Sequence, residues 1–185
     1  MIKALIFASF LPVAANAAPS EQFAAFLAER CVAPTQDARA PVSAGLTQFT
    51  PAQSKQLGRS LKKSFEDWTL WTDAQAQHVL GIPQDDDACE VLAFGLSTHD
   101  AIQTWGLINR YEGLRGTVEL TTAPLAGTKI DNFGSASGAI HVAEKDFVQV
   151  NMSFAGSSSA SFTSVVVFRA VESQFACDLF PEECR

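Results

Sequence analysis

Two long stretches near the end of the chain, rich in β-branched and aromatic residues, constrain the fold most. Residues 147–154 and 161–171 flank Gly156-Ser157-Ser158-Ser159, a run of turn-forming residues. Long β-prone segments around such a turn predict an antiparallel hairpin. In residues 147–154, apolar and polar residues alternate, which is typical of a strand with one buried face and one solvent-exposed face. One side carries Val148, Val150, Met152 and Phe154, and the other carries Gln149, Asn151 and Ser153.

The first half of the chain carries helix signals instead. A helix is predicted from Ser20, where apolar residues recur at helical spacing until Pro34 ends it. Thr50-Pro51-Ala52-Gln53 is a capped helix start, and a second capping box with a glycine stop predicts a helix over residues 97–113.

Shorter strand patterns complete the secondary-structure prediction. We expect strands at residues 68–71, 89–96, 117–122, 127–133 and 138–143, and loops at 35–47, 81–87 and 134–137. Residues 73–78 fit either a turn or a short helix. Helices first and strands afterwards indicate an α+β fold. We therefore expect N-terminal helices packed on one face of a largely antiparallel sheet of about five or six strands.

The N-terminus has the pattern of a secretory signal. Lys3 precedes an apolar run over residues 4–13, and Ala15-Asn16-Ala17 is a small-x-small cleavage pattern. The run is shorter than the roughly 20 residues that span a bilayer. We expect residues 1–17 to be a signal peptide and residues 18–185 to form one α+β domain, periplasmic or secreted. The alternative is a buried N-terminal helix of the domain.

Four cysteines follow the expected signal: Cys31, Cys89, Cys177 and Cys184. An even number in an exported chain indicates two disulfides, although four cysteines allow three pairings and the sequence selects none. We favour Cys31–Cys89, which would tie the first helix to a core strand, and Cys177–Cys184, which would staple a C-terminus that otherwise frays. A metal site is disfavoured, because no Cys-x-x-Cys pair is present and no histidine lies at ligand spacing from a cysteine.

The charge balance excludes some partners. The chain has a formal net charge of −7, which disfavours nucleic acid and anionic membranes as partners, and we expect no membrane insertion after signal cleavage. One basic stretch stands out: Lys55, Arg59, Lys62 and Lys63 follow Thr50. It fits a patch for an anionic partner, but a solvated helix face is the interpretation we favour.

Catalytic motifs are weak throughout the sequence. Gly156-Ser157-Ser158-Ser159-Ala160 fails the Gly-x-Ser-x-Gly pattern at its last position, and Asp85-Asp86-Asp87 lacks the glycine of a calcium loop. His78, His99 and His141 are too scattered to indicate a zinc triad. We therefore expect no metal and no cofactor.

The polar side of the predicted hairpin is the best place for a binding site. His141 in a neighbouring strand is expected beside Gln149 and Asn151, and Trp71 could add an exposed aromatic side chain. The sequence thus favours a non-catalytic module of the cell envelope that binds an unidentified small molecule or envelope protein. The alternative is a hydrolase that uses His141 or His99 with a carboxylate.

Overall fold

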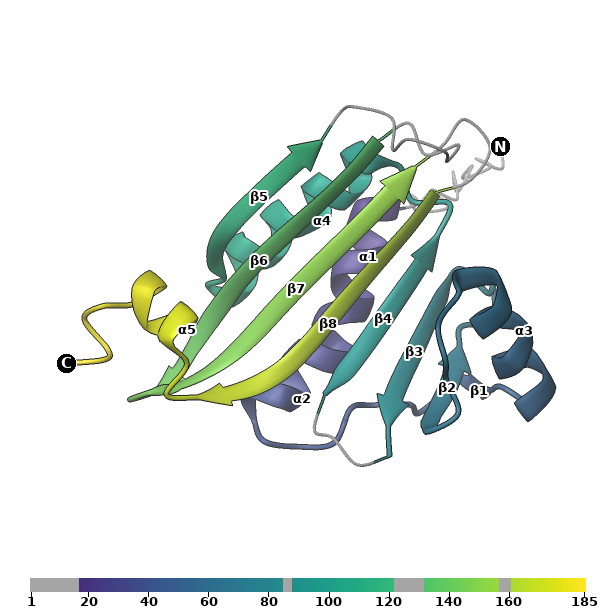
Figure 1. Cartoon of the computed structure of the whole chain (residues 1–185), viewed down its shortest axis with the longest axis horizontal. Helices are drawn as coiled ribbons and strands as arrows, with labels where there is room; N and C mark the ends of the chain where they lie inside the picture. The colour runs from purple at the N-terminus through teal and green to yellow at the C-terminus, as the bar shows by residue number, and fades with distance from the viewer. Residues whose placement is uncertain (1–16, 85–87, 122–131, 157–160) are drawn as a thin grey trace, which may run out of the picture.

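One eight-stranded antiparallel sheet organises the computed structural model of the chain (Figure 1), in which residues 17–84, 88–121, 132–156 and 161–185 are described. The strands run in the order β1-β2-β3-β4-β8-β7-β6-β5. They are β1 Thr47–Gln48, β2 Trp68–Thr72, β3 His78–Pro83, β4 Cys89–Phe94, β5 Arg115–Thr121, β6 Asn132–Ala143, β7 Asp146–Gly156 and β8 Ser161–Val171. The helices are α1 Pro19–Leu27, a π-helical turn η1 Ala28–Val32, α2 Ala33–Gln36, α3 Pro51–Leu61, α4 Thr98–Glu112 and α5 Gln174–Leu179.

The sheet consists of two antiparallel series, β1 to β4 and β5 to β8, which meet where β4 pairs with β8. Val91 lies opposite Val165 at this junction, and both are fully buried. Helix α4 connects the two series and lies beside α1 behind the sheet (Figure 1). The α+β class predicted from the sequence is therefore confirmed.

The main core lies between the sheet and the α1–α4 layer. Phe23 and Leu27 from α1 and Ile108 from α4 are at most 2% exposed and pack on the inward side chains of β3, β4, β6, β7 and β8. Each such side chain contributes about 1.5–3 kcal/mol when it is removed from water. This layer therefore provides most of the fold's apolar burial.

The number of strands and the placement of the helices differ from the prediction. The sheet has eight strands, and helices lie on both of its faces: α3 packs over β2 and β3, and α5 packs at the far end on β6 and β7. The prediction missed α5, which Ser173 caps through a hydrogen bond from the Ala176 N–H. It also missed β1 and β3, which are too short or too apolar to show clear alternation.

Residues 134–137, predicted to be a loop, lie inside β6 and pair with β5 and β7. Small residues are needed there because neighbouring groups come close: a Cβ at Gly134 would lie 2.3 Å from the Phe154 ring. Glycine and serine thus mark tight packing here and not a turn. The expected strand at 127–133 and the expected turn at 156–159 lie largely outside the described residues, as do the acidic run 85–87 and residues 1–16 of the expected signal.

Two disulfides join the two cysteine pairs that we favoured from the sequence. Cys31–Cys89 links η1 to β4 with a Cα–Cα distance of 5.8 Å, and both residues are fully buried. Cys177–Cys184 holds the C-terminal segment with a Cα–Cα distance of 5.5 Å. None of the helices in the described residues is long and apolar enough to cross a membrane.

The C-terminal segment is also held by Arg115 from β5. Its guanidinium lies 4.4 Å from the centre of the Phe180 ring and donates to Glu182 Oε1 at 2.8 Å. A backbone hydrogen bond and the Arg115 side chain both lower the pKa of the Glu182 carboxyl. The short α5 therefore depends on a disulfide, a stacked cation and one buried ring for its position.

The two disulfides should contribute unequally to stability. They span sequence separations of 58 and 7 residues, and the chain entropy of the unfolded state predicts losses of about 4 and 2 kcal/mol on removal. Urea unfolding of Cys31→Ala/Cys89→Ala and of Cys177→Ala/Cys184→Ala would measure both. A larger loss for the C-terminal pair would contradict this account of the fold.

Candidate functional site

Three of the four predicted binding residues share one face of the sheet. Gln149 and Asn151 are two residues apart on β7, and the β6–β7 register places His141 on the same face, opposite Phe147. This open face lies between α3 and α5 (Figure 1). Trp71 lies on the other face, where it packs against the main core, so the structure does not bring it together with the other three.

His141 is positioned by the C-terminal segment. Its Nε2 lies 3.1 Å from the Glu144 carbonyl oxygen and 3.5 Å from Glu183 Oε2, and its ring packs on Phe147 and Phe180. These contacts give the histidine a role in holding the chain end. They leave Gln149 and Asn151 as the half-buried polar pair of the open face.

His78, to which the sequence assigned no role, is the most enclosed histidine. It is 8% exposed, its ring packs against those of Phe23 and Phe26, and its Nδ1 is 2.7 Å from Asp73 Oδ2. Asp73 also accepts a hydrogen bond from the Gln77 N–H in the β2–β3 turn. This His–Asp pair lies on the α1 side of the sheet, within the packed core.

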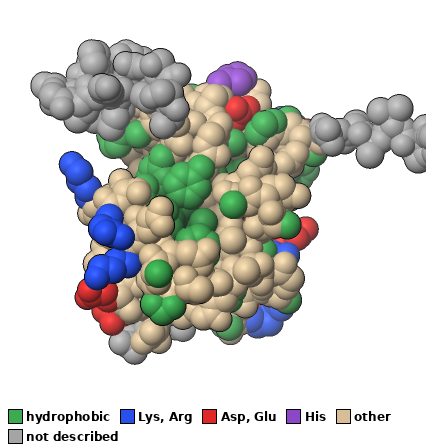
Figure 2. All heavy atoms as spheres, turned by 90° about the vertical axis from the view of Figure 1, so that its right-hand side faces the viewer, with side chains coloured by type: hydrophobic (Ala, Val, Ile, Leu, Met, Phe, Trp, Pro, Cys, Tyr) green, Lys and Arg blue, Asp and Glu red, His purple; other side chains and the backbone are tan. Residues whose placement is uncertain are grey.

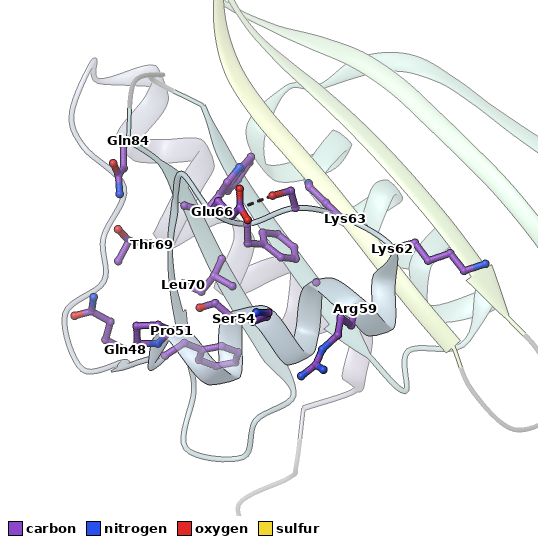
Figure 3. Close-up of a pocket in the computed structure, with 16 residues that line it drawn as sticks. Gln48, Pro51, Ser54, Arg59, Lys62, Lys63, Glu66, Thr69, Leu70 and Gln84 are labelled. Atoms are coloured by element: carbon purple, nitrogen blue, oxygen red, sulfur yellow. Dashed lines mark hydrogen bonds between the residues drawn. The ribbon is translucent and has the colours of Figure 1, made fainter.

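A groove with a volume of about 740 Å³ lies beside α3. Helix α3 forms one wall, and β2 with the segment before it forms the other (Figure 3). Figure 2 views this side of the molecule and shows hydrophobic side chains gathered at its centre, with Lys and Arg side chains along one margin. We call this hollow the α3 groove.

Local sequence signals fix where the helical wall begins. Thr50 caps α3 through its hydroxyl, Pro51 occupies the first turn, and the Thr50 N–H donates a hydrogen bond to Gln53 Oε1 at 2.8 Å. This is the capping box that the sequence predicted, and it satisfies backbone groups at the helix N-terminus.

The end of α3 is a tight left-handed turn. Lys62 has a φ of 52°, and the Lys63 N–H donates to the Gly58 carbonyl oxygen at 3.0 Å. A Cβ at Gly58 would lie 2.6 Å from the Lys63 carbonyl oxygen, so only glycine allows the chain to fold back this closely. Lysine at a left-handed position costs about 1 kcal/mol relative to glycine. Both Lys62 and Lys63, which form this turn, line the groove.

The floor of the groove is apolar. Phe65 and Leu70 are buried there, at 5% and 1% exposure, and Phe49 and Trp68 pack against the same small cluster. The Phe65 and Trp68 rings meet edge to face at 5.9 Å. Aromatic side chains in contact with water at the edge of such a cluster offer a large surface to an apolar ligand.

The lining is cationic in a chain that is otherwise acidic. Its basic side chains outnumber its single acidic one, Glu66, whereas the whole chain has a formal net charge of −7. The basic residues of the lining are Lys55, Arg59, Lys62 and Lys63. In Figure 3, Arg59 and Lys62 project from the C-terminal end of α3, while Gln48, Thr69 and Gln84 lie on the opposite side of the hollow.

Lys63 is the cation whose position is most constrained. It forms an ion pair with Glu90 of β4, and its Nζ lies 4.7 Å from the centre of the Trp68 ring. The Glu90 side chain is only 4% exposed and also accepts a hydrogen bond from Ser164 Oγ at 2.6 Å. A carboxylate this buried is stable only when it is paired, so Glu90 holds Lys63 against the aromatic floor.

The residues that line the groove define the chemistry it offers. Among residues 17–84, 88–121, 132–156 and 161–185, no cluster of His, Cys, Asp and Glu side chains could hold a metal ion. The groove lining includes no histidine and no cysteine. Its chemistry is that of cations and amides around an apolar floor.

Known proteins provide no further guide. No family model matches the chain, and neither a curated protein nor a solved structure matches it. The site is therefore assigned from its own geometry.

Prediction from sequence found only part of this site. It identified the basic face of α3 but favoured a solvated surface for it, because nothing local shows that β2 stands opposite. Glu90 is 27 residues from Lys63 and 74 from Ser164, and no spacing pattern links residues at such separations. The one available signal was a glutamate in an otherwise apolar strand, residues 89–96.

The Lys63–Glu90 pair should behave as a coupled unit. Lys63→Met leaves a buried carboxylate without its cation and should lower the free energy of unfolding by about 2 kcal/mol, less than for a fully buried pair because the lysine is 37% exposed. Adding Glu90→Gln should restore about half of this loss. Urea unfolding of both single variants and the double variant measures the coupling. Strictly additive losses would show that the pair does not hold the groove together.

Proposed function

We propose that this chain is an exported, non-catalytic binding protein whose α3 groove holds an anionic ligand that carries an apolar group. The observation that carries this proposal is the pairing of a cationic margin with an aromatic floor in one hollow. A volume of about 740 Å³ also falls within the roughly 300–1,000 Å³ typical of small-molecule sites.

Charge placement favours an anion. Cations at the end of α3 also stabilise the helix dipole, but that effect amounts to only a few tenths of a kcal/mol for exposed side chains and does not require them to border a hollow. Lys62 occupies its position despite an unfavourable backbone conformation. A positive cleft in a negative protein concentrates anions at this one place on the surface.

The apolar floor of the groove indicates that the ligand also carries an apolar group. Trp68 and Phe49 are only partly buried, and both line the groove. A small inorganic anion would leave this surface in water, whereas an amphipathic anion would cover it. Removal of apolar surface from water contributes roughly 25 cal/mol per Å².

Export is supported by the signal-like N-terminus and by the disulfides. Both cysteine pairs are joined, and such bonds persist in oxidising compartments. A periplasmic or secreted binding protein remains the interpretation that fits these features together.

A hydrolase is the second candidate, and the His78–Asp73 pair is the observation that favours it. Such a pair can orient an imidazole for general-base catalysis. The reaction also needs a nucleophile and space for a substrate. His78 packs against Phe23 and Phe26 and is not part of the α3 groove lining, so binding is the better supported function.

Calorimetric titration with decanoate tests the proposal. Decanoate should bind, and both acetate and decyltrimethylammonium should bind at least tenfold more weakly, because each lacks one half of the recognised chemistry. Arg59→Gln/Lys62→Gln should weaken decanoate binding about tenfold, which corresponds to about 1.4 kcal/mol. Arg110→Gln, on the exposed surface of α4, is the matched control and should leave the affinity unchanged.

Lys62→Gly separates binding from folding. Glycine relieves the left-handed backbone, so stability should rise by up to about 1 kcal/mol while decanoate affinity falls. Unchanged affinity in both Lys62→Gly and the double variant, or equal affinity for decanoate and decyltrimethylammonium, would overturn the proposed function.

A further inference from the structure

A second groove lies on the opposite side of the sheet, between α1 and α4. It has a volume of about 390 Å³, and both helices contribute to its lining. The two helices are in direct contact: Thr104 Oγ1 of α4 lies 3.3 Å from the Ser20 carbonyl oxygen of α1 and 2.8 Å from the Asp100 carbonyl oxygen of its own helix. We call this second groove the α1–α4 groove.

The floor of this groove is apolar and shallow. Ala24 and Ala25 of α1 and Ala28 of the adjoining η1 lie on one side, and Leu107 and Ile108 lie along α4. Tyr111 borders the groove with 71% of its surface exposed, the largest value among the exposed large hydrophobic side chains of the described residues. Alanines let another backbone come close, and an exposed tyrosine is the kind of side chain that anchors protein interfaces.

All the charged side chains in the lining are acidic: Glu21, Glu29 and Glu112. In the part of the chain that the structure describes, none of the three forms an ion pair. The charge of this lining is therefore opposite in sign to that of the α3 groove lining. Glu21 Oε2 also accepts a hydrogen bond from the Ala18 N–H at 3.2 Å, whereas no ion pair involves Glu29 or Glu112 within the described residues.

We infer that the α1–α4 groove is a docking surface for a basic amphipathic helix of a partner protein. A helix in this position would lie between two helices, with its apolar residues on the alanine floor and beside Tyr111. Charge complementarity selects lysine or arginine at its margins.

The spacing of the acidic residues sets the spacing of the partner's cations. Glu21 of α1 and Glu29 of the following turn η1 are eight residues apart in the sequence, which corresponds to roughly 12 Å at about 1.5 Å per residue. Cations seven or eight residues apart on the docked helix match that distance. Glu112 on α4 lies on the other side of the groove and favours a further cation on the opposite margin.

Fluorescence anisotropy with a labelled helical peptide tests this inference. The probe is a leucine–alanine peptide of about eighteen residues, long enough to form a helix, with lysines seven residues apart beside its apolar face. The same peptide with glutamate in place of lysine is the reference. The lysine peptide should bind at least tenfold more tightly than the glutamate peptide, and its affinity should fall with added salt.

Variants locate the binding. Glu21→Gln/Glu29→Gln and Tyr111→Ala should each weaken the lysine peptide about fivefold or more, with folding checked by circular dichroism. Glu144→Gln/Glu172→Gln removes the same charge from exposed positions near the ends of β6 and β8 and should change the affinity less than twofold. Arg59→Gln/Lys62→Gln should also have no effect, so this result is separate from that of the α3 groove.

The inference fails if the lysine peptide does not bind, or if it binds no better than the glutamate peptide. It also fails if Glu144→Gln/Glu172→Gln weakens binding as much as the groove variants do, because the attraction would then come from net charge alone. If the Tyr111→Ala variant and the unaltered protein bind the lysine peptide with equal affinity, the proposed apolar contact between Tyr111 and the docked helix is excluded.

Discussion

The Cys31–Cys89 disulfide joins the two layers on which the rest of the structure depends. It ties the end of the α1–η1 segment to β4, and β4 is the strand that connects the two halves of the sheet through its pairing with β8. The bond is fully buried among the side chains of the main core. Both grooves depend on this arrangement, because α1 forms one wall of the α1–α4 groove and β4 supplies the Glu90 carboxylate that holds Lys63 in the α3 groove.

Glu90 shows how the core and the α3 groove are coupled. Cys89 points into the helix layer, and the next residue points to the open face, where its carboxylate meets Lys63 and Ser164. A strand that is buried on both faces reads as apolar, and a charge within it needs a partner. The cation that satisfies Glu90 lies above Trp68, so one ion pair organises both the sheet face and the binding surface.

The sequence was most informative where signals are local. The capping box at Thr50 and the stop of α4 at Gly113, with a φ of 70°, follow from neighbouring residues alone. The 147–171 pair could be recognised because its strands are long and its connection short. The Cys31–Cys89 pairing could be favoured because one cysteine lies in a predicted helix and the other in a predicted strand, and the Cys177–Cys184 pairing because the two cysteines are close together near the C-terminus.

Prediction failed where tertiary packing overrides local pattern. The serines and glycines of β6 resemble a loop, but β5 and β7 on either side make them a strand. The sequence predicted helices on only one face of the sheet. The assembled sheet shows that α3 and α5 cover the two ends of its other face. The prediction placed the binding site near Asn151, because no local sequence pattern shows that β2 and β4 lie beside α3 and complete the α3 groove.

The most direct test of the central claim is an NMR titration of the isotope-labelled protein with decanoate. The account predicts that the largest amide shifts fall between Lys62 and Leu70, together with the Trp68 indole N–H. Shifts confined to the open sheet face around Gln149 and Asn151, with the α3 groove unaffected, would contradict it.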